Sequence, residues 1–172
     1  FAMGSPISHD NFDGNANLYI GIFTVLAVGL YLLNQQIKIS DKIKKILLVG
    51  FFYLSFGEMI LNFIWHGFHD QYGIPNRFSF LFGFVLLHML WEVFEHLDGT
   101  KGWHVAFACM AGVGLLAYAR VKGTQPLEDK VYGVAGMLFI LYGMILLLYT
   151  LSRKRKVWYK AAFCVVAIIE IA

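Results

Sequence analysis

Long apolar segments separated by short polar connections constrain this chain more than any other feature. Several segments approach the roughly 20 residues that an α-helix needs to cross a hydrocarbon core of about 30 Å. The composition agrees, since 59% of the 172 residues are hydrophobic and 15% are charged, whereas a soluble domain has about 25% charged residues. Helices satisfy their own backbone hydrogen bonds without water. The sequence therefore predicts an all-α fold, a polytopic transmembrane helical bundle.

The apolar segments divide the chain into a tail and a single transmembrane domain. Residues 1–16 form a polar N-terminal tail, and the stretch at 1–5 resembles a cloning remnant. Residues 17–172 are expected to form five to six spans, at about 18–33, 46–66, 78–97, 103–119, 131–151 and 157–172. The sixth span depends on its ends reaching the membrane surface, because its residues rise only about 24 Å as a helix.

Lysine and arginine residues orient the predicted spans. The connections after the first, third and fifth spans, with Lys160 just beyond, hold ten of them, and the connections after the second and fourth hold four. Because cytoplasmic connections carry the excess of positive charge, we expect the N-terminus outside and the basic connections in the cytoplasm, across a plasma (inner) membrane. Their placement between spans also argues against a nucleic-acid-binding surface.

Small residues recur at packing intervals in the spans that lack ionisable groups. Such residues let helix backbones approach closely in a membrane. We therefore expect them to pack within the bundle, with the interface of a homo-oligomer as the second interpretation, and membrane lipid as the other partner. The residues are Gly21, Ala27, Gly29, Ala108, Ala111, Gly112, Gly114, Gly133, Gly136 and Gly143.

Two predicted spans carry ionisable or polar side chains at helical spacing. Glu58, Asn62 and His66 recur every fourth residue in the second span, as do His88, Glu92 and His96 in the third, with Glu95 beside them. Residues four apart lie on one face of a helix. A carboxylate at the bilayer centre costs about 2.5–3.5 kcal/mol on insertion scales, so these two stripes are where a function is to be sought.

The depth of these residues indicates which of them could meet. Glu58 lies about 18 Å from the inner end of the second span, and His88 about 15 Å from the outer end of the third. A short connection joins these spans, so we expect them to be antiparallel neighbours. If the stripes face each other, Glu58, Asn62, His88 and Glu92 form one buried polar cluster near mid-membrane.

Other ionisable residues lie closer to the predicted membrane surfaces. We expect them to be solvated at the interface, although His66 also continues the first stripe. Trp65, Trp91 and Trp103 are typical of the aromatic belts at such interfaces. The interfacial residues are His66, His69 and Asp70 on the outer side and Glu95, His96, Asp98 and His104 on the inner side.

The mid-membrane cluster has the composition of a metal site. His88 and Glu92 can both face one ion, with Glu58 opposite, and facing helices of a bundle commonly build such sites. Asn62 and His66 are the further candidate ligands. A mixed nitrogen and oxygen set suits zinc, iron, manganese or copper, and a divalent ion with an open position could activate water or oxygen.

The favoured hypothesis is a membrane-embedded, metal-assisted enzyme that acts on a lipid or another apolar substrate, with Glu58, His88 and Glu92 as catalytic residues. The same residues could perform acid–base catalysis without a cofactor. A proton or metal-cation transporter or channel could use the same path, with Glu170 of the last segment as a further group. A structural or accessory subunit of a membrane complex is the third alternative.

Two short motifs are similar to sites in known membrane enzymes. Asn62-x-x-x-His66, followed by Pro75, resembles the Asn-x-x-x-His metal motif in the membrane subunit of copper ammonia and methane monooxygenases, but the later ligand position falls near Arg77. His88-x-x-x-Glu92 is similar to a step in membrane sterol isomerases. The rest of the chain supports neither resemblance, so no family is assigned from the sequence.

Overall fold

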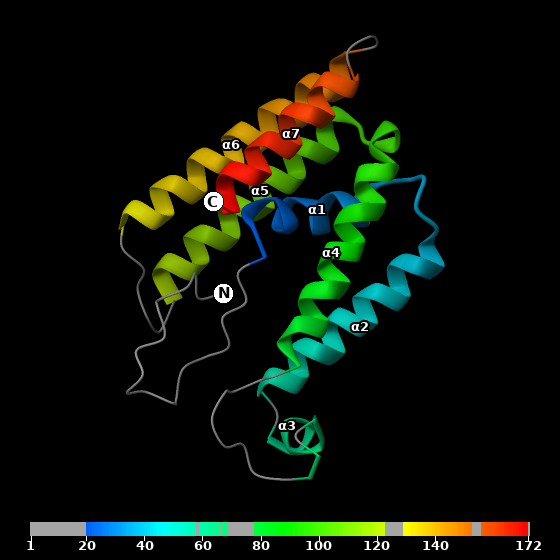
Figure 1. The fold of residues 1–172 in the computed structure, drawn as a ribbon, viewed down its shortest axis with the longest axis vertical. Helices are drawn as coiled ribbons and strands as arrows, with labels where there is room; N and C mark the ends of the chain where they lie inside the picture. Colours follow the sequence, from blue (N-terminus) through cyan, green and yellow to red (C-terminus); the bar gives the residue numbers. More distant parts are fainter. Residues whose placement is uncertain are drawn as a thin grey trace. The chain divides into compact units, whose positions relative to one another are not determined.

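The computed structural model describes residues 20–57, 59–65, 67–68, 78–122, 129–152 and 156–171, and all regular secondary structure among them is helical (Figure 1). This confirms the predicted all-α class. The elements are α1 (Ile22–Leu33), α2 (Ile39–Gly57), α3 (Met59–Trp65), α4 (Ser79–Glu95), the 3-10 turn η1 (Leu97–Gly99), α5 (Gly102–Lys122), α6 (Asp129–Leu151) and α7 (Lys156–Ile171).

The chain divides into two compact units. The first comprises Phe1–Ile20 and Ile39–His88, and the second comprises Gly21–Lys38 and Met89–Ala172. Helix α4 is continuous and contributes its first part to one unit and its last turns to the other. Each unit is best understood from its own contacts.

Aromatic side chains hold the first unit together. Phe78, which precedes α4, stacks on Trp65 of α3 with ring centroids 5.0 Å apart and on Phe56 of α2 at 5.2 Å. Phe82 of α4 meets Phe56 edge to face at 5.5 Å. Aromatic pairs contribute about 0.5–1.5 kcal/mol beyond their buried area, so these contacts account for how α2, α3 and α4 associate.

The second unit is a bundle of α1, α5, α6 and α7, in which α5, α6 and α7 run beside one another (Figure 1). Its core includes Tyr31 of α1 and Phe139 and Tyr142 of α6, which are almost completely buried. Glycines permit the close approach of α5 and α6, because a Cβ atom at Gly112 would lie 2.3 Å from the Phe139 ring.

Not all of the small residues serve this packing. Added Cβ atoms at Gly114, Gly133 and Gly136 would find no atom within 4 Å among the residues that the structure describes. The predicted role in helix packing therefore fits Gly112, and also Gly143, where a Cβ atom would lie 2.8 Å from the sulfur of Cys109. The expected homo-oligomer stays a prediction.

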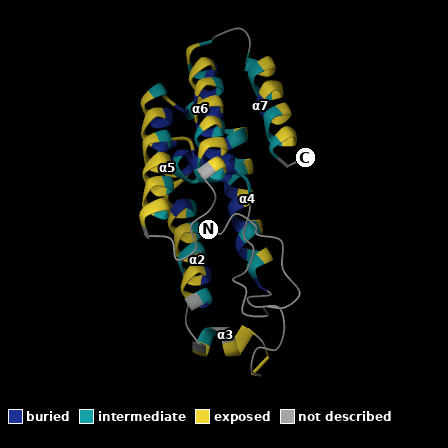
Figure 2. Cartoon of the chain, turned by 90° about the vertical axis from the view of Figure 1, so that its left-hand side faces the viewer, coloured by how far each residue is buried: buried dark blue, intermediate teal, exposed yellow. Residues whose placement is uncertain are grey.

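Two of the described helices are long and apolar enough to cross a membrane, Gly102–Val121 in α5 and Lys130–Leu151 in α6. Only 22% of each segment is buried, and Figure 2 shows exposed residues along both helices, so most of their apolar surface is free to meet lipid. Helix α1 is apolar but has only 12 residues. Five to six spans thus stay a prediction.

The second predicted span and the second helix differ in where they begin. Helix α2 starts at Ile39, ahead of residue 46, so Lys42, Lys44 and Lys45 belong to the helix and not to a connecting loop. Lysine is a good helix former, and Asp41 in the first turn favours a helix start. Apolar content alone therefore places this boundary too late.

Candidate functional site

Helix α4 displays the part of the predicted cluster that the structure describes. His88 is exposed, and Glu92, one turn further along the same helix, is half-buried. His88 lies about 14 Å from the start of this apolar helix and about 10 Å from its end. Because its side chain is exposed, packing in the core does not account for a histidine in the middle of this apolar helix.

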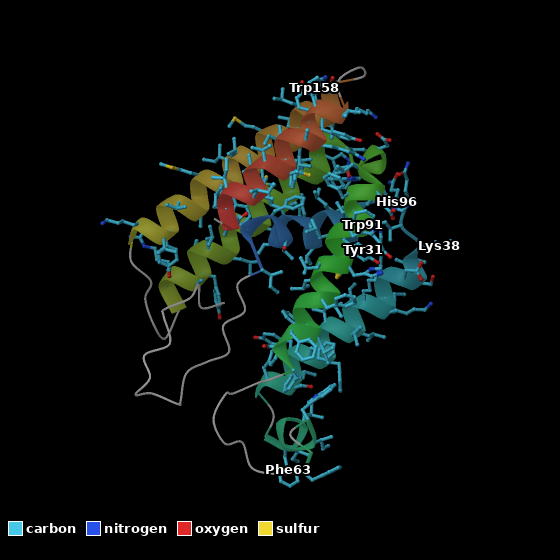
Figure 3. All side chains as sticks on the ribbon, viewed as in Figure 1. Tyr31, Lys38, Phe63, Trp91, His96 and Trp158 are labelled. Atoms are coloured by element: carbon cyan, nitrogen blue, oxygen red, sulfur yellow. The ribbon has the colours of Figure 1, made fainter. Side chains whose placement is uncertain are left out.

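One face of α4 is exposed along its whole length, and we call it the exposed α4 face. Its members recur three or four residues apart, which places them on one side of the helix, whereas Phe82, Leu86, Met89 and Val93 occupy the buried side. Figure 3 labels Trp91, one of its members. The exposed α4 face consists of Phe80, Phe84, Leu87, His88, Trp91 and Glu95.

The two glutamates near His88 on α4 differ in their exposure. Glu95 is exposed on the same face, while Glu92 lies at its half-buried edge. The sequence interpretation placed Glu95 beside the stripe of His88 but expected it to be solvated at the membrane interface, and it assigned Trp91 only to that interface. Their spacing from His88, seven and three residues, already carried the signal that they share its side of the helix.

The predicted metal ligands on the other stripe cannot be placed. Glu58 and His66, like His69 and Asp70, lie outside the described residues, and for Asn62 the structure describes the α3 backbone but not the side chain. Among the described residues no group of three or more His, Cys, Asp or Glu side chains could hold a metal ion. The five-residue ligand set therefore stays a prediction.

A polar joint fixes the end of α4 within the second unit. Asn34, fully buried just after α1, donates from Nδ2 to the carbonyl of His96 at 2.7 Å. A Cβ atom at Gly99 would lie 2.5 Å from Asn34 Oδ1, so a larger residue there would force the Asn34 side chain to shift. His96 Nδ1 lies 2.9 Å from the Glu92 carbonyl oxygen, which accepts a hydrogen bond from the ring when that nitrogen carries a proton.

One of the inner histidines corrects the expectation of interfacial solvation. His104 is fully buried, and its Nδ1 accepts a hydrogen bond from the Lys101 N–H at 3.1 Å. The ring therefore caps the first turn of α5 instead of facing water, because early helix N–H groups have no partner within the helix. Glu95 and Asp98, by contrast, are exposed as expected.

Asp98 joins η1 to α6 and α7. Its Oδ1 accepts hydrogen bonds from the Lys156 ammonium and from the Tyr149 hydroxyl, the latter at 2.9 Å. Lys156 also lies over the Tyr149 ring, 5.3 Å from its centroid. The hydrogen bond from Lys156, and then the one from Tyr149, hold the pKa of Asp98 below its usual value.

Glu170 of α7 is bound inside the second unit. Its Oε2 accepts a hydrogen bond from the Tyr142 hydroxyl at 2.7 Å, and its Oε1 accepts one from the backbone N–H of Ile22, the first residue of α1. The carboxylate thus serves as a cap for α1, whose own N-cap residue, Gly21, provides no side chain. A negative charge at a helix N-terminus is favourable.

The fold and composition define the class first: the chain is an integral membrane protein built from helices. A family model described as bacterial membrane protein YfhO matches residues 3–172, so the chain belongs to this family. No curated protein and no solved structure was found to match it. The membrane location predicted from composition is therefore confirmed.

Proposed function

We propose that this membrane protein is an enzyme that acts on a lipid or another apolar substrate, with the polar residues of α4 at its active site. The observation that carries the proposal is the exposed imidazole of His88 near the middle of an apolar helix. Holding such a group in a membrane is costly. An exposed position makes it accessible to a substrate that diffuses in the lipid.

The residues supply the groups that acid–base chemistry needs. An imidazole can both take up and release a proton. Glu92, one turn away, and Glu58, predicted to lie opposite, are the carboxyl groups that would complete a proton-transfer site. In the metal-assisted form of the proposal, His88, Glu92, Glu58, Asn62 and His66 hold a divalent ion, which would polarise the substrate or activate water.

Lipid turnover tests the proposal. Purified protein is incubated with a bacterial lipid extract, and lipid masses are compared by mass spectrometry for the wild type, His88→Ala, Glu92→Gln and a control, Leu148→Ala. Leu148 of α6 is 48% exposed, so its variant makes a similar change to an exposed apolar surface on another helix. We expect turnover by the wild type and Leu148→Ala, with at least a hundredfold loss in the other two. Absence of any lipid change with the wild type contradicts the proposal.

Elemental analysis of the same preparations tests the metal. The metal-assisted form predicts about one zinc, iron, manganese or copper ion per chain, lost in His88→Ala combined with Glu92→Ala. A low metal content that the variant does not alter would rule out the ion and leave cofactor-free acid–base catalysis by the same side chains.

A structural role in a larger membrane complex is the second candidate, and the second unit favours it. Glu170 and Asn34 both use their side chains to bind helix ends, which is how a scaffold is made rigid. If this were the whole function, substitutions of His88 would alter neither lipid composition nor metal content, while substitutions of Glu170 would weaken the fold.

We also propose a topology for the chain, with five to six spans in the plasma membrane and the N-terminus outside. The support is the ten-to-four distribution of basic residues. Single cysteines replacing Lys101 and Lys130, in a chain without Cys109 and Cys164, test it. A membrane-impermeant thiol reagent should label position 130 in intact cells and position 101 only after permeabilisation. The reverse pattern would invert the orientation.

A further inference from the structure

The exposed α4 face is apolar at its N-terminal end and polar at its C-terminal end. Phe80, Phe84 and Leu87 are 69%, 67% and 48% exposed and wholly apolar. Trp91 is 60% exposed, and Glu95, the last residue of the helix, is exposed with its carboxylate. The distance from Glu95 to Phe84 is about 16 Å along the helix, close to the depth of one leaflet of the hydrocarbon core, about 15 Å.

The polar end has the chemistry of an ammonium site. A carboxylate and the face of a tryptophan both attract cations, and here Trp91 and Glu95 are one helical turn apart on the same side. The C-terminal end of α4 already holds an ammonium group, because Lys160 Nζ lies 3.1 Å from the Phe94 carbonyl oxygen and 5.1 Å from the centroid of its ring. The negative end of the helix dipole strengthens this preference.

We propose that a phospholipid with an amine headgroup docks along the exposed α4 face. Its ammonium lies at Glu95 and Trp91, and one acyl chain follows Leu87, Phe84 and Phe80. An anionic headgroup without an amine would bring its phosphate to the Glu95 carboxylate, and the nearby Lys160 ammonium is already bound to the Phe94 carbonyl oxygen. The charge of the face therefore selects among lipids that have the same chains.

This inference rests on the proposed function, because it names the class of lipid that would be the substrate of the site on α4. His88 lies about 10 Å deeper than Glu95, beyond an interfacial layer of about 5–8 Å. A lipid bound by its ammonium at Glu95 therefore presents to His88 the region where its headgroup joins its acyl chains. The bond acted on would be in that region and not at the amine.

Competitive lipid binding tests the docking directly. The full-length protein in detergent receives equal amounts of phosphatidylethanolamine and phosphatidylglycerol with identical chains, and native mass spectrometry counts the lipids retained. The wild type should retain the ethanolamine lipid at least fivefold more. Glu95→Gln and Trp91→Leu should each reduce this preference about two- to fivefold. Trp158→Leu, which alters a tryptophan that is 76% exposed on α7, should leave it unchanged.

The outcomes separate this inference from the proposed function. No preference for the amine lipid in the wild type, or an equal loss in Trp158→Leu, overturns the docking. His88→Ala should retain the preference, because the imidazole is not part of the ammonium site. Selective binding without any lipid turnover would refute the enzyme and keep the docking, whereas lipid turnover without selective binding would refute the docking alone.

Discussion

At the scale of single residues, the ionisable groups of this membrane protein divide by what surrounds them. Glu170 and Asp98 are held by donors from other helices, so they serve the architecture. His88 and Glu95 stand on an exposed helix face, where we propose that they meet lipid. Ionisable residues of this protein thus serve either the stability of the fold or the proposed site, and the surroundings of each side chain distinguish the two roles.

The cap that Glu170 provides for α1 can be measured by substitution. Glu170→Gln removes the charge at the helix N-terminus but keeps the shape, and we expect a loss of about 1–2 kcal/mol in the free energy of unfolding. Tyr142→Phe should cost about 1 kcal/mol, and the two losses should not add, because the residues share one hydrogen bond. Thermal unfolding in detergent measures both. Full additivity would contradict the contact.

The Asp98 contact predicts a pH dependence with a definite sign. The pKa of Asp98 is lowered in the fold, so its stabilisation is present above the unfolded pKa, about 3.9, and is lost as the pH falls through the lower folded value. The stability difference between wild type and Asp98→Asn should therefore be constant from about pH 7 to pH 5 and shrink only below about pH 4. Shrinkage already near pH 6 would contradict it.

At the scale of helices, apolar runs in the sequence coincide with helices in the structure, but the ends of helices do not follow from apolarity. Helix α2 starts among lysines because these residues favour helices, and α4 ends where Asn34 and Gly99 form a joint. That joint brings together segments more than 60 residues apart in the chain, a relation that no local pattern reveals.

Packing between α5 and α6 offers a matched pair of substitutions. Gly112→Ala would place a methyl group 2.3 Å from the Phe139 ring, and we expect it to cost about 1–3 kcal/mol as overpacking. Gly114→Ala, two residues away on the same helix, meets no described atom within 4 Å and should be neutral or slightly stabilising, since alanine favours helices. Equal effects in thermal unfolding would refute the predicted packing.

At the scale of the whole molecule, composition was sufficient to predict a helical membrane protein, and the match to the YfhO family bears this out. The candidate site was predictable only in part. Helical spacing placed His88 and Glu92 one turn apart and Glu95 on the side of His88, but it could not show that this side is exposed. Nor could it show that Glu170 has its partners 28 and 148 residues away. Burial and long-range hydrogen bonds depend on tertiary structure, which spacing does not encode.

The central claim is that His88 on the exposed α4 face performs chemistry on a lipid. Its most direct test is the turnover of phosphatidylethanolamine in nanodiscs by the wild type and by His88→Ala, followed by mass spectrometry, with unfolding temperatures measured alongside. We predict a product that appears with the wild type and is absent with His88→Ala, although the two proteins have the same unfolding temperature. Equal turnover by both proteins, or by neither, would contradict the claim.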